Sequence, residues 1–425
     1  MLRRLFFLLA CLVCTAMEGR AQQVKDSDSL PTENVKAQTV ISGLVTDRQT
    51  GRSLSHVTIM AEGGEPRTVS NEDGRFVLKV AGLPRYFLVS HIGYRTQQIP
   101  VEQGKTTDLR VSLTASPIAL GEIIISAEDP EVILQAAMAR IRQNYPSEPE
   151  LLRCFYRETA RRGTRFISVA EAVTEMYKTG YLHGPERDAV AILKGRRLMS
   201  MKSTDTLGVK IQGGPVMPLM VDVVKNPDYL LNDENLRLCT LHMETPEKID
   251  DRLHYVISIQ PLSSTAIPLL GGRLYIDQET LAFSRAELQL DMSDWRRAAD
   301  YMLVSKPMGL HFRPKELGMT IVYHTDSLGV TRMSYVRNVM RFNCDWKRRL
   351  FASSFTTVSE MVITDREQHG RDIRRPRGRS SFGMRERFYD RVEYFEDPGF
   401  WADYNIIEPT ESLENAIGRL KKRLK

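Results

Sequence analysis

Histidine and glutamate residues at the spacing of a metal site are the first candidates for chemistry in this sequence. His183 and Glu186 form an H-x-x-E pair, and His311 or His324 could supply a distant third ligand. Hydrolysis at zinc requires three such protein ligands, an open coordination position and a separate general base. These residue types therefore raise a zinc-dependent hydrolase as one interpretation of the chain.

The sequence around the H-x-x-E pair argues against this interpretation. Gly184 and Pro185 separate His183 from Glu186 and favour a turn, and a glutamate-rich chain produces such spacings by chance. The patterns G-x-S-x-G, S-x-x-K and H-E-x-x-H do not occur. We therefore predict a protein that is not an enzyme, with no catalytic residue, no cofactor and no metal ligand. A zinc-dependent hydrolase stays the less favoured alternative.

A second group of polar residues lies near the middle of the chain. Gly213-Gly214 lacks the lysine and hydroxyl of a phosphate-binding loop. Asp222 and Lys225 could bind a ligand, but the valines around them indicate packed structure. An ion pair or a turn contact is the interpretation that we favour for these two residues.

Cationic residues are concentrated in two C-terminal segments. The segment from His369 to Arg387 combines arginine with proline, glycine and serine, which is typical of a solvated loop or of a contact with anionic head groups. A final helix is predicted after Pro409, with an apolar stripe suited to packing on its own sheet or to membrane binding. The stripe consists of Leu413, Ile417, Leu420 and Leu424. The predicted surface contact comprises Arg374, Arg375, Arg377, Arg379, Lys421, Lys422 and Arg423.

The first residues have the pattern of a secretory signal peptide, residues 1–21. A cationic start precedes the apolar run from Leu5 to Met17, and small residues precede the predicted cleavage after Ala21. Leu8 to Cys11 resembles a lipoprotein box, but cleavage there would leave too short an apolar region. We predict export to the periplasm, with association with the outer membrane as a further expectation. A polar, flexible leader follows over residues 22–38.

The net charge indicates which partners to expect, and the cysteine content indicates whether disulfides form. Removing the signal takes away three arginines and one glutamate, so the formal net charge falls from +6 to +4. That charge is too small to indicate nucleic-acid binding, and export makes nucleic acid a poor partner. The mature chain keeps Cys154, Cys239 and Cys344, an odd and widely spaced set that predicts buried thiols and no disulfide framework.

Residues 39–127 read as a small β-sandwich. Short apolar runs such as Val57–Ile59, Phe76–Leu78 and Phe87–Val89 are separated by glycine, asparagine and aspartate turns. Strands of this length with turns every ~8–12 residues are typical of antiparallel sandwiches. Asp73-Gly74 supplies the positive φ that a tight hairpin needs.

The order of these pieces resembles the carboxypeptidase-like regulatory domain family. The matching pieces are Gly43-x-Val45-x-Asp47, Thr50-Gly51, Leu54-x-x-Val57-x-Ile59, Thr68-x-Ser70, Asp73-Gly74-x-Phe76 and Ile92-Gly93-Tyr94. This resemblance implies a prealbumin-type, seven-stranded sandwich of the kind found at the N-terminus of many Gram-negative envelope proteins, including outer-membrane receptors. It implies a binding or packing module without an active site.

The remainder is predicted to form a linking helix, residues 128–147, and a larger domain, residues 148–425. Asp129 is a good helix N-cap, and Pro130 suits the first helical position. The predicted buried face of this helix comprises Val132, Ile133, Ala136, Ala137, Ile141 and Tyr145. Consecutive short strands beyond Leu151 predict a curved antiparallel sheet. The fold class is therefore mainly β: a sandwich plus an α+β domain with a C-terminal helix.

Two further resemblances concern this larger domain. The strand–turn–strand around Tyr275-Ile276-Asp277-x-Glu279-Thr280 is similar to periplasmic lipoprotein carriers, which implies a half-barrel wrapped over a helix. Several segments in order resemble an uncharacterised C-terminal domain of exported Gram-negative envelope proteins, which implies no assigned activity. They are Gly213-Gly214-Pro215, Asp222 to Pro227, Leu274 to Asp277 and Phe400-Trp401-x-x-Tyr404-Asn405-Ile406-Ile407-x-Pro409.

These observations predict a non-enzymatic envelope protein. We expect a binding or interaction module at the periplasmic side of the outer membrane, with an envelope protein, lipid or glycan as partner and peripheral membrane contact as a further expectation. A lipid or lipoprotein carrier with a half-barrel cavity is the first alternative.

Overall fold

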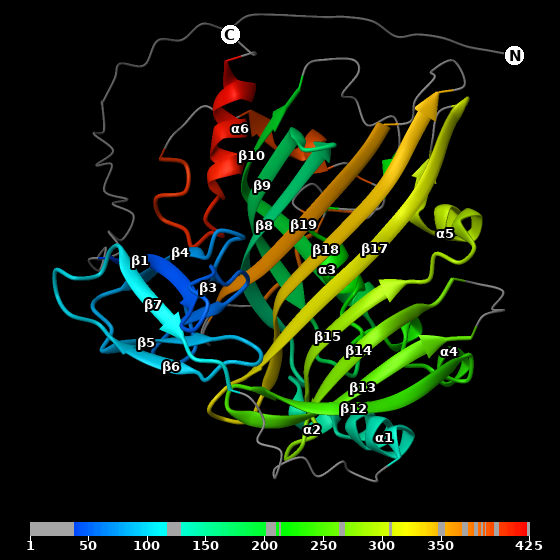
Figure 1. Ribbon diagram of the computed structural model, residues 1–425, viewed down its shortest axis with the longest axis horizontal. Helices are drawn as coiled ribbons and strands as arrows, with labels where there is room; N and C mark the ends of the chain where they lie inside the picture. The colour runs from blue at the N-terminus through cyan, green and yellow to red at the C-terminus, as the bar shows by residue number, and fades with distance from the viewer. Residues whose placement is uncertain are drawn as a thin grey trace, which may run out of the picture. The chain divides into compact units, whose positions relative to one another are not determined.

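The N-terminal residues of the computed structural model form two facing β-sheets (Figure 1). One sheet has the order β4 (Arg75–Ala81), β1 (Gln38–Asp47), β7 (Leu109–Leu113). The other has the order β3 (Arg67–Val69), β2 (Thr58–Ala61), β5 (Tyr86–Ser90), β6 (Gln97–Pro100). The predicted seven-stranded sandwich is thus confirmed. One pairing differs from the antiparallel pattern, because β1 and β7 run parallel, as strands joined by a long crossover can.

The structure describes residues 38–116, 129–200, 210–211, 214–262, 268–305, 308–346, 353–367, 373–377, 381–383, 386, 388–394 and 399–422. The predicted signal peptide, nearly all of the leader and residues 117–127 of the predicted sandwich lie outside these residues. Among the described residues, no helix combines the length and apolar character that a membrane-spanning helix requires.

The core of the sandwich follows the alternation seen in its sequence. Ile41, Val45, Phe76, Leu78 and Phe87 point inward and are buried together. The parallel approach of β7 to β1 requires Gly43, because a Cβ there would lie 2.4 Å from the Leu109 carbonyl oxygen. The hairpin glycine Gly74 adopts the expected positive φ of 79°.

The larger domain is built on one sheet of eleven strands (Figure 1). Its order is β12 (Cys239–Ile249), β13 (Arg252–Pro261), β14 (Leu270–Asp277), β15 (Phe283–Leu290), β17 (Leu310–Thr325), β18 (Thr331–Trp346), β19 (Ser353–Arg366), β8 (Glu150–Arg162), β9 (Arg165–Lys178), β10 (Ala189–Met199) and β20 (Glu393–Tyr394). All pairs are antiparallel except the short β20, which runs parallel to β10. The predicted mainly β, α+β class is confirmed.

Both faces of this sheet are covered around β8 and β9, whereas β17 keeps an exposed polar face at His311, Arg313 and Lys315. On β8, Cys154 and Tyr156 point to one face and Phe155 to the other. The first face packs against α1 (Pro130–Ala139), α2 (Ile141–Asn144) and the segment 214–236. That segment contains α3 (Met217–Met220), η3 (Pro227–Tyr229) and α4 (Asp233–Leu236). The remaining elements are η1 (Pro185–Arg187), the small pair β11 (Lys210–Ile211) and β16 (Leu303–Ser305), α5 (Trp295–Met302) and η5 (Phe388–Arg391).

Helix α1 begins where the sequence predicts. The Asp129 side chain accepts a hydrogen bond from the Glu131 N–H, and Pro130 occupies the first turn. The predicted buried face is wrong at Val132, which is 59% exposed, whereas Leu134 is buried. The sheet meets the helix on the Ile133–Leu134–Ala137 side, which rotates the buried face away from Val132.

The C-terminal helix α6 (Glu411–Lys421) packs on the second face of the sheet. Thr410 caps it by accepting a hydrogen bond from the Leu413 N–H at 3.1 Å. Leu413, Ala416 and Leu420 are buried against side chains of β9 and β10. Packing on its own sheet is therefore the role of the apolar stripe, and membrane insertion by that stripe is wrong. Leu424 lies outside the described residues.

Candidate functional site

The residues considered for zinc do not converge. His183 and Glu186 are exposed beside η1. His311 and His324 lie near opposite ends of β17, thirteen residues apart, which is roughly 40 Å along a strand. One ion cannot bind both. Within the described part of the chain, no three His, Cys, Asp or Glu residues are grouped to hold a metal ion, so nothing there supports the zinc alternative.

Asp222 and Lys225 lie in a buried polar network on the face covered by segment 214–236. The Lys225 N–H faces Asp222 Oδ1 at 3.4 Å, which is the predicted turn contact. The two residues form ion pairs with other partners and not with each other. Lys178 Nζ lies 2.6 Å from Asp222 Oδ2, and Lys225 Nζ lies 2.7 Å from Asp188 Oδ1. Burial, reinforced by the charge of Lys178, lowers the pKa of Lys225 to about 8. Two lysines thus face two aspartates, so each of these buried charges has a partner of opposite sign.

The predicted cationic surface is described in part. Arg374, Arg375 and Arg377 are exposed, and the Arg375 guanidinium donates to the backbone carbonyls of Glu186 and Asp188 at 3.2 and 3.4 Å. Lys421 and Lys422 close helix α6. Arg379 and Arg423 lie outside the described residues. A surface contact through these residues stays a prediction, now without the apolar stripe of α6.

The C-terminal segment 399–411, here called the strap, lies between the sandwich and the large sheet. Toward the sandwich, Thr68 Oγ1 donates to the Ile406 carbonyl at 2.9 Å, and Asn71 Nδ2 donates to the Pro409 carbonyl at 3.0 Å. Toward the sheet, Arg157 Nη2 donates to the Ile407 carbonyl at 2.6 Å. The strap therefore connects the two parts of the fold.

The strap also closes an apolar layer on the sheet. Trp401 packs edge-on against Phe155, with ring centroids 5.6 Å apart. Its indole N–H donates to Glu171 Oε2 at 3.1 Å, and Glu171 is paired with Arg157 at 2.7 Å. Glu171 is buried, and burial alone would raise its pKa, but the arginines beside it outweigh burial and lower the pKa. The charge beneath the strap is therefore fully partnered.

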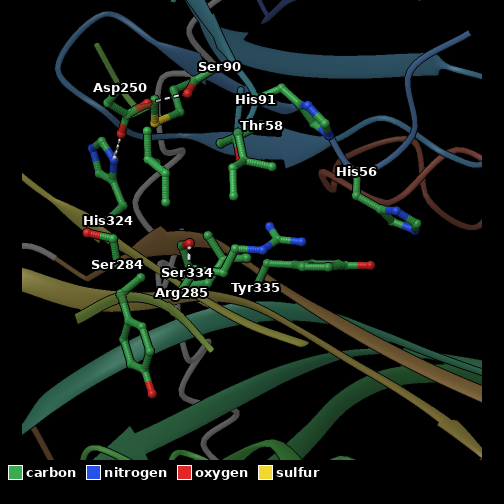
Figure 2. Close-up of a pocket in the computed structure, with 15 residues that line it drawn as sticks. His56, Thr58, Ser90, His91, Asp250, Ser284, Arg285, His324, Ser334 and Tyr335 are labelled. Carbon is green, nitrogen blue, oxygen red and sulfur yellow. Dashed lines mark hydrogen bonds and ion pairs between the residues drawn. The ribbon is translucent and has the colours of Figure 1, made fainter. Parts of the chain in front are cut away.

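A small pocket, here called the seam pocket, opens between the sandwich and the sheet (Figure 2). Its volume is about 40 Å³, room for about two or three water molecules. The sandwich contributes β2, β5 and their flanking loops, and the sheet contributes the β12–β13 turn and β15, β17 and β18. The polar lining residues are His56, Thr58, Ser90, His91, Asp250, Ser284, Arg285, His324, Ser334 and Tyr335.

At one end of the seam pocket, Asp250 joins the two parts of the fold (Figure 2). Ser90 of the sandwich donates to Asp250 Oδ1, and His324 Nδ1 lies 3.8 Å from Asp250 Oδ2. Burial alone would raise the pKa of Asp250, but His324 and Ser90 together outweigh burial and lower it. The carboxylate sits between hydroxyl and imidazole, so His324 is not placed to take a proton from Ser90.

Beneath the pocket, His254 contacts Ser284. The ring Nε2 lies 2.8 Å from Ser284 Oγ, and Nδ1 lies 2.9 Å from the Arg252 carbonyl. Ser284 is the extra residue of a β-bulge, because the register jumps from Phe283 to Arg285. Burial lowers the pKa of His254. Both ring nitrogens have partners, as expected of a buried structural histidine.

At the other end, His56 faces an acidic side chain of the sheet. His56 Nε2 lies 3.6 Å from Glu360 Oε1, which also accepts a hydrogen bond from the Tyr335 hydroxyl at 2.7 Å. Burial alone would raise the pKa of Glu360, but His56 and Arg337 outweigh it and hold that pKa at about 2. His56 has a positive φ of 56°, a conformation that is uncommon outside glycine.

A polar ring nitrogen without a partner among the described residues lies in the middle of the pocket. The His91 Nδ1 atom is buried and has no hydrogen-bond partner. Burial, and then the charge of Arg285, lower the pKa of His91 to about 4. Figure 2 shows Arg285 extending into the space between His91 of the sandwich and Tyr335 of the sheet. The arrangement can bind a small polar group, and nothing in it aligns a nucleophile with an open base.

The sandwich matches a known domain family. Residues 41–125 match the CarboxypepD_reg-like domain family. A TonB-dependent receptor of Formosa agariphila is 28% identical over 97 residues, which is 23% of this chain and 9% of that receptor. The chain thus matches about a tenth of that relative's length. The resemblance of the sandwich to the regulatory domain family is confirmed.

Solved structures were compared with the larger part of the chain. A LolA superfamily protein from Nitrosomonas europaea aligns over 56% of this chain and 95% of its own, with 15% identity and a TM-score of 0.18. A DUF1329 family protein from Desulfovibrio piger aligns over 56% and 94%, with 12% identity and a TM-score of 0.23. Scores this low establish no shared fold, so the lipoprotein-carrier resemblance stays a prediction.

Most residues of the seam pocket carry no signal in the sequence. His324 was a candidate zinc ligand, whereas His56, His91, Asp250 and Arg285 were not predicted as site residues. These residues come from separate segments of the sandwich and the sheet, and their neighbours read as ordinary turn and strand sequence. No local pattern marks them, because the pocket forms only where the sandwich and the sheet pack against each other.

Proposed function

We propose that this protein is a non-enzymatic binding module of the bacterial cell envelope, and that it binds its ligand in the seam pocket. One observation carries the proposal: residues of the CarboxypepD_reg-like sandwich and of the sheet converge on a single polar pocket with unpartnered donors. A related sandwich in a TonB-dependent receptor supports the envelope location, and the predicted signal peptide supports export toward the periplasmic side of the outer membrane.

The strap supports a fixed binding site. It hydrogen-bonds to the sandwich through Thr68 and Asn71 and to the sheet through Arg157. A site whose walls are held in place loses less conformational freedom when a ligand binds. The sandwich therefore acts as one wall of the site and not as a tethered accessory.

The carrier alternative receives less support from the packing. A half-barrel carrier needs an apolar cavity on the inner face of its sheet. Here the segment 214–236 fills that face, with Leu219, Val223 and Leu231 buried against the sheet. A bound acyl chain would have to displace this segment together with the buried ion pair of Asp222 and Lys178, which would be costly.

Site-specific crosslinking in the native envelope tests the proposal. A diazirine amino acid at Thr58 would sit in the pocket, and the same group at the exposed Leu83 of the sandwich is the matched control. We expect fractionation to place the protein in the envelope, and irradiation to add a ligand mass at Thr58 but not at Leu83. A cytoplasmic protein, or equal adducts at both positions, would refute the proposal.

A further inference from the structure

We propose that the seam pocket binds the carboxylate or phosphate group of an anionic ligand, with Arg285, His91 and His56 as the donors. This inference rests on the proposed function, because it names the ligand class of the same pocket. The pocket admits the head group alone, and the remainder of the ligand would extend out of the seam.

The guanidinium of Arg285 is placed for such a group. Its Nε atom lies 2.7 Å from Glu287 Oε1, and its two terminal amino groups make no hydrogen bond within the described part of the chain. Figure 2 shows this guanidinium in the space between the sandwich and the sheet. Paired amino groups of arginine match the two oxygens of a carboxylate or phosphate.

The two histidines of the sandwich lie opposite Arg285 and carry nitrogens without hydrogen-bond partners. These are His91 Nδ1 and His56 Nε2, both buried. His56 Nε2 lies 3.6 Å from Glu360 Oε1, beyond hydrogen-bond distance but within ion-pair distance, so an anion would compete with Glu360 for this histidine. Buried polar atoms are nearly always hydrogen-bonded, so such atoms beside a pocket indicate a bound group or water. An oxyanion between the histidines and Arg285 would give all three a partner.

The carboxylates near the pocket have partners, but two of those partners, His56 and Arg285, are proposed donors themselves. Asp250 accepts from Ser90 and faces His324. Glu360 accepts from Tyr335 and faces His56 and Arg337. Glu287 is paired with Arg285 and accepts from the Tyr275 hydroxyl at 3.3 Å. An incoming anion would therefore share Arg285 with Glu287 through the two terminal amino groups, and would compete with Glu360 for His56.

Anion binding should be coupled to proton binding. In the empty pocket, burial and the charge of Arg285 disfavour protonated His91. An anion between His91 and Arg285 would offset that charge and favour the protonated imidazole. By linkage, protonation then strengthens anion binding in the same measure. Affinity for the anion should rise as the pH falls from 7.5 toward 5.5.

Titration calorimetry of the full mature protein tests the inference. Acetate and succinate probe a carboxylate, inorganic phosphate probes a phosphate, and chloride at equal ionic strength is the control. We expect binding of a carboxylate or of phosphate, and tighter binding of acetate at pH 5.5 than at pH 7.5, because acetate stays mostly ionised over this range while the bound anion favours protonated His91. Whichever probe binds identifies the head group.

Variants connect this binding to the proposed donors. R285Q should weaken binding at least about tenfold, as loss of a charge-assisted bidentate contact does, and R285K should lose less. H91Q should remove most of the pH dependence. R313Q is the control, because Arg313 is exposed on β17 beside Trp295, and its affinity should equal that of the wild type. If R285Q fails to fold by circular dichroism, R285K and H91Q decide the question.

Two outcomes would overturn the inference. One is the absence of binding by all three anions at both pH values, and the other is equal binding by R285K, H91Q and R313Q. Either result leaves the crosslink at Thr58 as an independent readout. An adduct at Thr58 without anion binding would mean that the pocket binds a ligand of other chemistry, whereas loss of both would refute the proposed function as well.

Discussion

The side-chain amide of Asn405 forms two hydrogen bonds with the backbone of Lys79. The Lys79 N–H donates to Asn405 Oδ1 at 2.7 Å, and Asn405 Nδ2 donates to the Lys79 carbonyl at 2.9 Å. The amide thus takes the place of a neighbouring strand at the edge of β4, where unpaired backbone groups would otherwise face solvent. The Lys79 ammonium adds bonds to the carbonyls of Trp401 and Tyr404. A short polar contact therefore anchors the sandwich to the strap.

Asn405→Ala should destabilise the protein by about 1–3 kcal/mol, because it leaves a backbone donor and acceptor of β4 without partners. Urea denaturation of the full mature chain measures this loss. Asn343→Ala on β18 is the matched control, because the Asn343 side chain makes no hydrogen bond to the residues that the structure describes, and it should shift stability by less than about 0.5 kcal/mol. Equal losses in the two variants would contradict the anchoring role of Asn405.

Trp401→Ala should have a larger effect of about 3–5 kcal/mol, as expected for truncating a buried tryptophan. It removes the contact with Phe155 and the hydrogen bond to Glu171. Hydrogen exchange should show faster exchange at β3 and β4 as the sandwich detaches. Trp295→Ala, at a partly exposed position of α5, is the control and should leave exchange in the sandwich unchanged. Unchanged exchange in the Trp401 variant would mean that the strap does not hold the sandwich.

Acid should lower the free energy of unfolding of the protein in two stages. The folded-state pKa of His91 is about 4, below its usual 6.5. The contribution of neutral His91 to the free energy of unfolding is therefore complete above pH 6.5 and is lost as the pH falls from 6.5 through 4. The folded-state pKa of Glu360 is about 2, below its usual 4.5, so its contribution is lost as pH falls from 4.5 through 2. Between pH 6.5 and 4, the titration of His91 lowers the free energy of unfolding by at most about 3 kcal/mol.

His91→Gln isolates the first stage. Unfolding free energies of wild type and variant, measured by urea denaturation from pH 7.5 to pH 4, should converge as the pH falls. The wild type loses the His91 contribution over this range, whereas the variant has no group there to titrate. Parallel pH profiles for the two proteins would show that His91 is not held neutral by its surroundings.

Lys225→Met should destabilise the protein by about 3–5 kcal/mol, because it leaves the Asp188 carboxylate buried without its ion pair. The double variant Lys225→Met/Asp188→Asn should recover part of that loss, since it removes the unpaired charge as well. Thermal and urea unfolding of the two single variants and the double variant form a double-mutant cycle. Additive losses would indicate that the two side chains do not interact.

The sequence by itself determined the features that depend on neighbours along the chain. Turn residues such as Asp73-Gly74 and the alternation around Phe76 predicted the strands of the sandwich, because backbone conformation and side-chain direction are set locally. Asp129 and Pro130 predicted the start of α1 for the same reason. The order of these local pieces was enough to indicate the CarboxypepD_reg-like domain.

The tertiary structure alone decided which distant surfaces meet. The sequence favoured packing of the α6 stripe on its own sheet and kept membrane binding as the alternative, and the apolar face offered by Val169 and Leu198 buries the stripe. The strap binds the backbone of Lys79, which lies more than three hundred residues before Asn405 in the sequence. The donors of the seam pocket come from both sides of the fold, so long-range packing, which no local periodicity encodes, creates the pocket.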